Sequence, residues 1–330
     1  MKKKIYLVTL LATLIIPSLV SNVHADGPYL MKYAALAPEG SIWGKYVRIM
    51  QQEIQKRSSG RIKFIPYLGG VAGDEKTISK KLRAGLIHIA SFSGQGLGEM
   101  LPAIRVFELP MLFNSYSEVD RAVAAVGPDI ESQFKARGYV MAGWGEGGFV
   151  YLLSKKPISS VESMKGMRIW APAGDPVVKS LFVKYGFVPT YVGIESVLPQ
   201  LQTGGLEAVY GPPMAVIGLQ WFREVNYLTN IKLAYSVGGT IMNKRKLEEL
   251  PADLQAIVLD VFKTYSRKLV LELRSQNDRA LKTLQSYDIK MISLPSSDIT
   301  KLRSSAVEVQ NSLAGSLYTK ELLDKIKRAK

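Results

Sequence analysis

Hydrophobic residues in the first half of the chain follow two spacings in turn. Alternating or short continuous apolar runs predict strands, and apolar residues repeated every three or four positions predict helices. Strands are expected over residues 29–36, 61–67, 86–92 and 139–144, and helices over residues 43–54, 74–83 and 118–136. This alternation of strand and helix favours an α/β fold with a largely parallel sheet.

A second unit of the same kind is predicted to begin near Phe149. Its strands are expected over residues 167–170, 188–192 and 206–210, and its helices over residues 176–185, 197–202 and 214–222. Residues 231–242 are expected to be extended and to cross between the two units. Two α/β domains are therefore predicted.

One helix is predicted to be longer than either domain. After Pro251, apolar residues keep helical spacing as far as Leu281. A helix of roughly 35 residues would be about 50 Å long, whereas a small domain is about 30 Å across. Sustained heptads are absent, so we expect a spine shared by both domains and not a coiled coil. Domain I is then expected to comprise residues 26–148 and 238–275, and domain II residues 149–237 and 276–330.

The N-terminal residues have the pattern of a secretory signal peptide. Three lysines at positions 2–4 precede an almost wholly apolar run, residues 5–20, which is interrupted by Pro17. This run is shorter than the roughly 20 residues of a membrane span, and small or permissive residues lead to Ala25. We expect residues 1–25 to be removed after Ala25 and the mature protein to reach the periplasm.

Composition excludes several classes of function. The chain has no cysteine and only two histidines, which excludes disulfides, thiolate metal sites and cysteine nucleophiles and leaves little room for zinc enzymes. The glycine-rich run at residues 143–148 lacks the Lys-Ser/Thr of a phosphate-binding loop. No nucleophile–base set is apparent, so we expect no enzyme activity, no metal and no cofactor.

Net charge changes this picture little. There are 43 Lys and Arg against 28 Asp and Glu, a formal charge of +15. These basic residues are dispersed, and no nucleic-acid-binding motif accompanies them, so we expect no nucleic-acid partner. A solvated basic surface is the favoured interpretation, and attraction to an anionic membrane or an acidic partner is the weaker alternative.

Four stretches, in this order and spacing, match one family pattern. They are a strand, glycine loop and helix over residues 60–88, Lys-Pro-Ile followed by Met-Lys-Gly-Met-Arg-Ile over 156–169, Gly-Phe-Val-Pro followed by Leu-Gln-Thr-Gly-Gly-Leu over 186–206, and Trp-Phe-Arg-Glu-Val over 221–225. Over residues 29–310 the chain resembles the periplasmic solute-binding proteins of TRAP transporters, the DctP family. The resemblance implies two α/β domains around a ligand cleft, crossing strands and a long helix spanning both domains. It also implies a small-molecule binder, expected to be a monomer, that delivers its ligand to the small and large subunits of a membrane permease.

Three positions depart from the family pattern, and all three lose a polar side chain. Trp170 stands where the family usually has the arginine that clamps a substrate carboxylate. Val150 stands where a second arginine is common, and Gly211 where an asparagine usually precedes proline. Arg168, two residues before Trp170, is the nearest replacement for the clamp.

These departures predict an atypical, apolar-leaning site. We expect a ligand that is predominantly apolar or that lacks the usual clamped carboxylate. The candidate ligand-binding residues are Phe92, Ser93, Trp144, Glu146, Val150, Arg168, Trp170, Tyr191, Tyr210 and Gly211. Alternatives are a TRAP protein that binds an organic acid through Arg168, an exported lipid carrier or binding protein of an ABC importer, and an exported enzyme.

Overall fold

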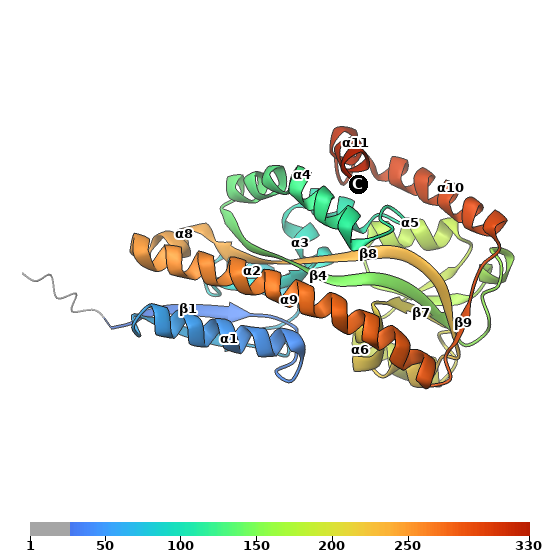
Figure 1. The fold of residues 1–330 in the computed structure, drawn as a ribbon, viewed down its shortest axis with the longest axis horizontal. Helices are drawn as coiled ribbons and strands as arrows, with labels where there is room; N and C mark the ends of the chain where they lie inside the picture. The colour runs from blue at the N-terminus through green and yellow to red at the C-terminus, as the bar shows by residue number, and fades with distance from the viewer. Residues whose placement is uncertain (1–26) are drawn as a thin grey trace, which may run out of the picture.

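The computed structural model describes residues 27–330, so the expected signal peptide and its cleavage after Ala25 lie outside the described residues. Nine strands in the described residues form one sheet (Figure 1). In spatial order they are β2 (Ile62–Tyr67), β1 (Tyr29–Ala34), β3 (Ile89–Ser93), β8 (Tyr227–Asn243), β4 (Tyr139–Ser154), β7 (Ala208–Gly211), β5 (Arg168–Ala171) and β6 (Val188–Tyr191), and β9 (Lys290–Ile292) pairs with β8.

The sheet is parallel at its two ends and antiparallel in the middle. β1 pairs in parallel with β2 and β3, and β5 pairs in parallel with β6 and β7. The expected parallel arrangement fails in the centre, where β3–β8, β8–β4 and β4–β7 are antiparallel. The reason is that β4 and β8, 16 and 17 residues long, pair with each other in the centre of the sheet, where β8 also joins β3 and β4 also joins β7.

The helices cover both faces of this sheet. Ser41 caps the first helix by accepting a hydrogen bond from the Gly44 N–H, which satisfies one of the free donors at a helix start. The α-helices are α1 (Ile42–Arg57), α2 (Glu75–Arg83), α3 (Gly94–Met100), α4 (Tyr116–Ala136), α5 (Pro176–Lys184), α6 (Ile194–Gln202), α7 (Pro213–Gly218), α8 (Lys244–Glu248), α9 (Ala252–Ser286), α10 (Ser296–Leu313) and α11 (Lys320–Ala329). Short 3₁₀ helices include η1 (Pro102–Glu108) and η3 (Trp221–Arg223).

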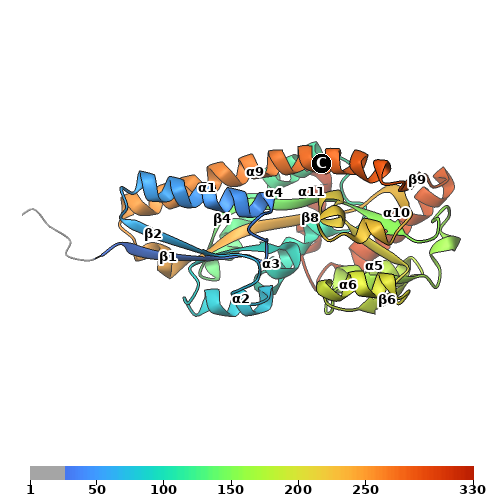
Figure 2. The same ribbon diagram turned by 90° about the horizontal axis from the view of Figure 1, so that it is seen from below.

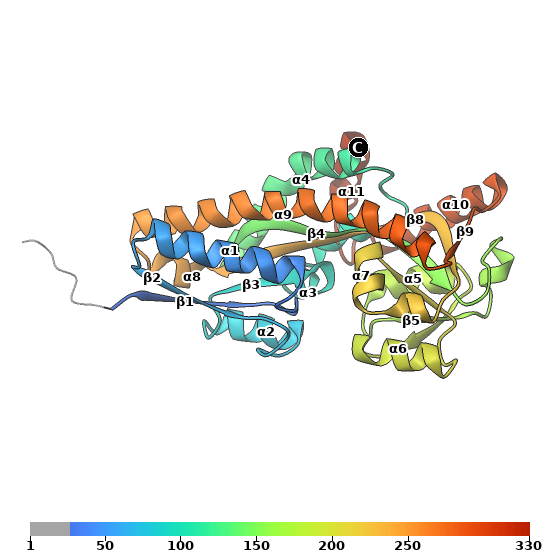
Figure 3. The ribbon, with the colours of Figure 1, turned by 60° about the horizontal axis from the view of Figure 1, so that its bottom comes forward.

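Two lobes can be distinguished (Figures 2 and 3). We call β1–β3 with α1–α3 and η1 the first lobe, and β5–β7 with α5–α7 the second lobe. The 35-residue helix α9 packs on α1 of the first lobe, on β4 and on α7 of the second lobe. The sequence-based prediction of one long helix along both domains is therefore confirmed.

The C-terminal helices join the lobes a further time. Helix α10 packs on α5, whereas α11 packs on α4, which precedes β4 in the chain (Figure 1). Lys325 of α11 pairs with Asp129 of α4 at 2.6 Å. Across residues 27–330, each helix falls short of the combined length and hydropathy that a membrane crossing requires.

Candidate functional site

Helix α3 has three glycines, which make it intrinsically unstable. Each glycine inside a helix costs about 1 kcal/mol relative to alanine. A Cβ at Gly94 would overlap the carboxyl group of Glu108, and one at Gly96 would overlap that of Glu75. A Cβ at Gly98 would lie 2.8 Å from Cδ of Arg105. The glycines therefore make room for three charged side chains packed against one helix.

One of these side chains crosses between the lobes. The Arg105 guanidinium, on η1, lies with Nε 2.7 Å from Glu108 Oε2 and donates from Nη2 to Asp175 Oδ2 at 2.7 Å. Asp175 precedes α5 in the second lobe. The side chains of Arg105 and Asp175 are 6% and 4% exposed, so this ion pair is out of contact with bulk water. We call Arg105, Glu108 and Asp175 the interlobe cluster.

Asp175 has two tasks. Its Oδ1 accepts hydrogen bonds from the N–H groups of Val177 and Val178 at 3.0 and 3.1 Å and so caps α5. Its Oδ2 is left to bind Arg105. A second contact between the lobes lies close by in sequence, where the Gln95 amide donates to the Ala173 carbonyl at 3.4 Å.

Carboxylates outnumber the guanidinium in this region. Burial raises the pKa of Glu108 to about 7, against the opposing attraction of Arg105, and the negative charge of Asp175 raises it further. Burial also raises the pKa of Glu75, whose carboxyl group accepts hydrogen bonds from the N–H and hydroxyl of Ser93. Burial in this region therefore favours the neutral form of both glutamates.

An aromatic group adjoins the cluster in the second lobe. The ring of Trp170 stacks on that of Tyr210 with 5.2 Å between the ring centroids, and it meets the ring of Trp221 edge-on, also with 5.2 Å between the centroids. Burial raises the pKa of Tyr210, and the negative charges of Asp175 and Glu108 raise it further. We call Trp170, Tyr210 and Trp221 the aromatic wall.

Trp170 has no free polar group. Its Nε1 donates to the Val192 carbonyl at 3.0 Å, and the residue is 9% exposed. Gly211 follows Tyr210 on β7, and a Cβ there would make an ordinary 3.7 Å contact with the ring of Trp221. The structure thus brings Trp170, Tyr210 and Gly211 together around Trp221.

Four other candidate residues lie on three different strands, β3, β4 and β6. Phe92 is buried, and Ser93 ends β3 and caps α3. Val150 is 5% exposed and pairs with Ala234 across β4 and β8. Tyr191, at the end of β6, is 45% exposed.

Arg168 points to the chain's own carbonyl groups. It lies at the start of β5, whereas Asp175 follows the other end of that strand. Its Nε and Nη2 donate to the carbonyls of Gly205 and Gly204 at 3.1 and 2.9 Å, and its side chain is 49% exposed. The structure places this guanidinium apart from the interlobe cluster.

Trp144 and Glu146 contact the helices that flank the crossing strands. The indole N–H of Trp144 donates to Glu131 of α4 at 2.7 Å. Glu146 is 5% exposed and accepts hydrogen bonds from the Tyr235 hydroxyl at 2.7 Å and from Arg274 Nε at 3.0 Å.

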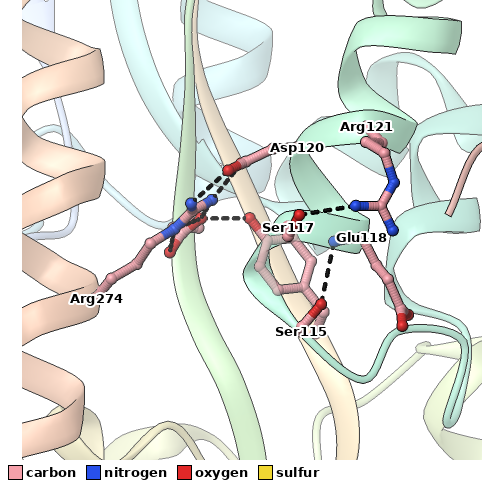
Figure 4. Close-up of polar contacts among 8 residues, drawn as sticks. Ser115, Ser117, Glu118, Asp120, Arg121 and Arg274 are labelled. Atoms are coloured by element: carbon pink, nitrogen blue, oxygen red, sulfur yellow. Dashed lines mark hydrogen bonds and ion pairs between the residues drawn. The ribbon is translucent and has the colours of Figure 1, made fainter.

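Arg274 continues these contacts to a second helix. It extends from α9 and binds Asp120 of α4 through two hydrogen bonds of 2.7 and 2.8 Å (Figure 4). We call Glu146, Tyr235, Arg274 and Asp120 the crossing network. It ties β4, β8, α4 and α9 together.

Sequence reasoning missed the interlobe cluster. Two signals in the chain mark the first-lobe side of this cluster. Glycines at positions 94, 96 and 98 directly follow a buried strand, and Arg105 and Glu108 are charged residues three apart within an apolar run. Asp175 before Pro176 is also a recognisable helix start.

Comparison with known proteins gives a family. Residues 33–315 match the family model of the bacterial extracellular solute-binding proteins, family 7, also named DctP. The chain belongs to this family. Its members are periplasmic proteins that bind small-molecule ligands and work with membrane permease components, and they are not enzymes.

Two curated relatives illustrate the similarity. A solute-binding protein of Verminephrobacter eiseniae is 25% identical over 67% of this chain and 66% of its own length. A solute-binding protein of a Sulfitobacter species is 21% identical over 92% of each chain.

Solved structures share the fold. An extracytoplasmic solute receptor of Bordetella pertussis, solved with pyroglutamic acid, has a TM-score of 0.83 at 19% identity and covers 91% of this chain and 99% of its own. A TRAP periplasmic solute-binding protein of Sulfurospirillum deleyianum, solved with succinate, has a TM-score of 0.82 at 18% identity and covers 92% of this chain and all of its own. At these identities the likeness establishes the architecture alone.

Proposed function

We propose that this chain is the extracytoplasmic receptor of a TRAP-type secondary transporter. It takes one small molecule between its two lobes and presents it to the small and large permease subunits. The continuous strands β4 and β8 and the helix α9 support this proposal, because a few connecting elements that bend allow two lobes to open and close. The mature protein starts at Asp26 after signal-peptide cleavage, acts as a monomer and divides into the two domains defined from the sequence.

The proposed ligand is predominantly apolar, or at least lacks the carboxylate that an arginine clamps. The observation that carries this proposal is the environment of Trp170. Its indole lies against Tyr210 and Trp221, and its one donor is used by the Val192 carbonyl. These largely buried rings lack the paired donors that bind a carboxylate.

Organic acids are the alternative ligand class. The solved relatives named above were obtained with pyroglutamic acid and succinate, which supports this alternative. Its sequence-based form assigns the clamp to Arg168, but that guanidinium donates to Gly204 and Gly205. An ABC-type or lipid-carrying role would be separated from the proposed one by reconstitution with a TRAP permease.

Calorimetry tests the ligand proposal. The mature protein would be titrated with fatty and isoprenoid compounds, with small dicarboxylates and with sugar acids. We expect an apolar compound to bind, and Trp170→Ala to weaken its binding by about 10- to 100-fold through lost aromatic contact. Arg168→Ala, the matched control on the same strand, should change affinity less than about twofold. Tight binding of a small carboxylate that Arg168→Ala abolishes and Trp170→Ala tolerates would contradict the proposal.

A further inference from the structure

The ion pair between Arg105 and Asp175 joins residues that are brought together only when the lobes meet. Arg105 belongs to η1 of the first lobe and Asp175 to the start of α5 in the second, 70 positions later in the chain. Opening the lobes would expose both charges to water and remove the 2.7 Å contact. The two charges are therefore paired only while the lobes are together.

The Arg105 guanidinium is already occupied in the closed protein. Two of its nitrogens face carboxylates, Nε that of Glu108 and Nη2 that of Asp175. A ligand carboxylate that approached either of these two nitrogens would have to displace Glu108 or Asp175. It would also add a negative charge close to the buried carboxylate of Asp175, where the low dielectric constant strengthens repulsion.

The surroundings of Arg105 are built to hold it in place. Gly98 leaves the space that its stem fills, and Gly94 leaves the space for its partner Glu108. A helix that tolerates these glycines at its own cost indicates that the position of the guanidinium is specified by the sequence.

We infer that the Arg105–Asp175 pair is an interlobe latch that takes the place of a ligand carboxylate in closing the protein, and that Arg105 thereby determines specificity against acids. This inference rests on the proposed function, because it assumes that the solute is held between the lobes. It explains how the lobes can close when Val150 and Trp170 replace the family's arginines. The closing charge contact is supplied by the protein itself.

Asp175→Asn is a selective test of the latch. Asparagine is as good as aspartate at capping a helix, so its side-chain oxygen can still accept from Val177 and Val178. Only the charge that faces Arg105 is lost. Asp74→Asn is the matched control, since Asp74 caps α2 by accepting from Thr77 and is exposed.

Small-angle scattering of ligand-free protein gives the first measurement. We expect Asp175→Asn to increase the radius of gyration toward that of an open form, and Asp74→Asn to superimpose on wild type. Arg105→Lys, which keeps the charge but lacks the fork that reaches both carboxylates, should open the lobes in part. Scattering curves of wild type, Asp175→Asn and Arg105→Lys that all superimpose would overturn the inference.

Calorimetry with succinate gives the second measurement. Freed from Asp175, Arg105 should let the Asp175→Asn variant bind succinate at least tenfold more tightly than wild type does. Wild-type binding of succinate that is equal to or tighter than that of Asp175→Asn would refute the specificity role while leaving the receptor function intact. Failure of the receptor function would instead appear as wild-type protein that binds neither apolar compounds nor acids.

Discussion

The interlobe cluster and the crossing network place the same chemistry in two different settings. In each, one arginine lies between two carboxylates, Arg105 between Glu108 and Asp175, and Arg274 between Glu146 and Asp120. The first joins the two lobes. The second joins β4, β8, α4 and α9, the elements that run between the lobes or flank the strands that do.

The two groups therefore have different consequences, one for the stability of the fold and the other for the position of the lobes. The outer carboxylate of the crossing network, Asp120, is 60% exposed, whereas that of the interlobe cluster, Asp175, is 4% exposed. Opening the lobes would hydrate the interlobe cluster, whereas the outer carboxylate of the crossing network is already in contact with water. A buried arginine pair thus supports the fold in one region and the closed state in the other.

The largest effect on stability is expected in the crossing network. Arg274→Met would leave the carboxylate of Glu146 buried without its cation, which costs about 3–5 kcal/mol of unfolding free energy. Chemical denaturation would measure it. Arg279→Met, an exposed position on the same helix, is the control and should change stability by less than about 0.5 kcal/mol. Equal losses for the two variants would break the comparison.

The bend in β4 gives the next largest effect. Gly148 has φ +100°, and a Cβ there would come within 2.5 Å of the Asn277 amide nitrogen. We expect Gly148→Ala to reduce the unfolding free energy by about 2–4 kcal/mol. Gly166 has φ +74° with open space around it, so Gly166→Ala isolates backbone strain and should cost about 1 kcal/mol. Thermal unfolding would measure both losses. Equal losses in the two variants would show that the close approach of Asn277 to Gly148 adds no cost.

A smaller effect depends on pH and is confined to the interlobe cluster. Burial raises the pKa of Glu108 from 4.5 to about 7, while Arg105 and the Val237 N–H oppose this shift. The folded chain therefore keeps this proton through a range in which the unfolded chain has released it. The unfolding free energy should fall by about 1–3 kcal/mol as pH rises from 4.5 to 7. The negative charge of Asp175 strengthens the shift.

Glu108→Gln should flatten that pH dependence. The neutral amide removes the ionisation that burial opposes, so the variant should lose the decline in unfolding free energy between pH 4.5 and 7. Glu162→Gln, an exposed position paired with Lys165, should keep the wild-type slope. Denaturation curves at several pH values would decide this, and an unchanged slope in Glu108→Gln would show that another group causes the decline.

The smallest effect is expected at Arg168. Its ion pair with Glu207 is 3.5 Å long and half exposed, so Arg168→Ala should lower the unfolding free energy by no more than about 0.5 kcal/mol. The same denaturation series measures it. A loss above 2 kcal/mol would indicate that its bonds to the Gly204 and Gly205 carbonyls are structural anchors.

Hydrophobic spacing along the chain predicted those helices and strands in which the spacing is regular. Helix α9 could be found because its apolar spacing continues without a break, and its length alone required a shared spine. Strand β4 was predicted only as far as residue 144, because glycines in the run 143–148 read as a loop. In the structure, β4 remains paired with β8 through this run, although the register shifts between Met141 and Gly143 and between Glu146 and Gly148.

The aromatic wall could be predicted from the sequence more readily than the interlobe cluster. Trp170 and Tyr210 could be proposed together because they end neighbouring strands of one predicted unit. Arg105 and Asp175 lie in different lobes, and helix α3 has too many glycines for helix propensity to predict it. Their pairing depends on how the lobes meet, which no spacing along the chain encodes.

Native mass spectrometry of the freshly purified mature protein tests the central claim most directly. The spectrum would be recorded under gentle conditions, and the released small molecule would then be identified. The proposed function predicts one molecule per chain that is uncharged or predominantly apolar, and a lower occupancy in Trp170→Ala. A small carboxylic acid retained by both proteins would contradict it.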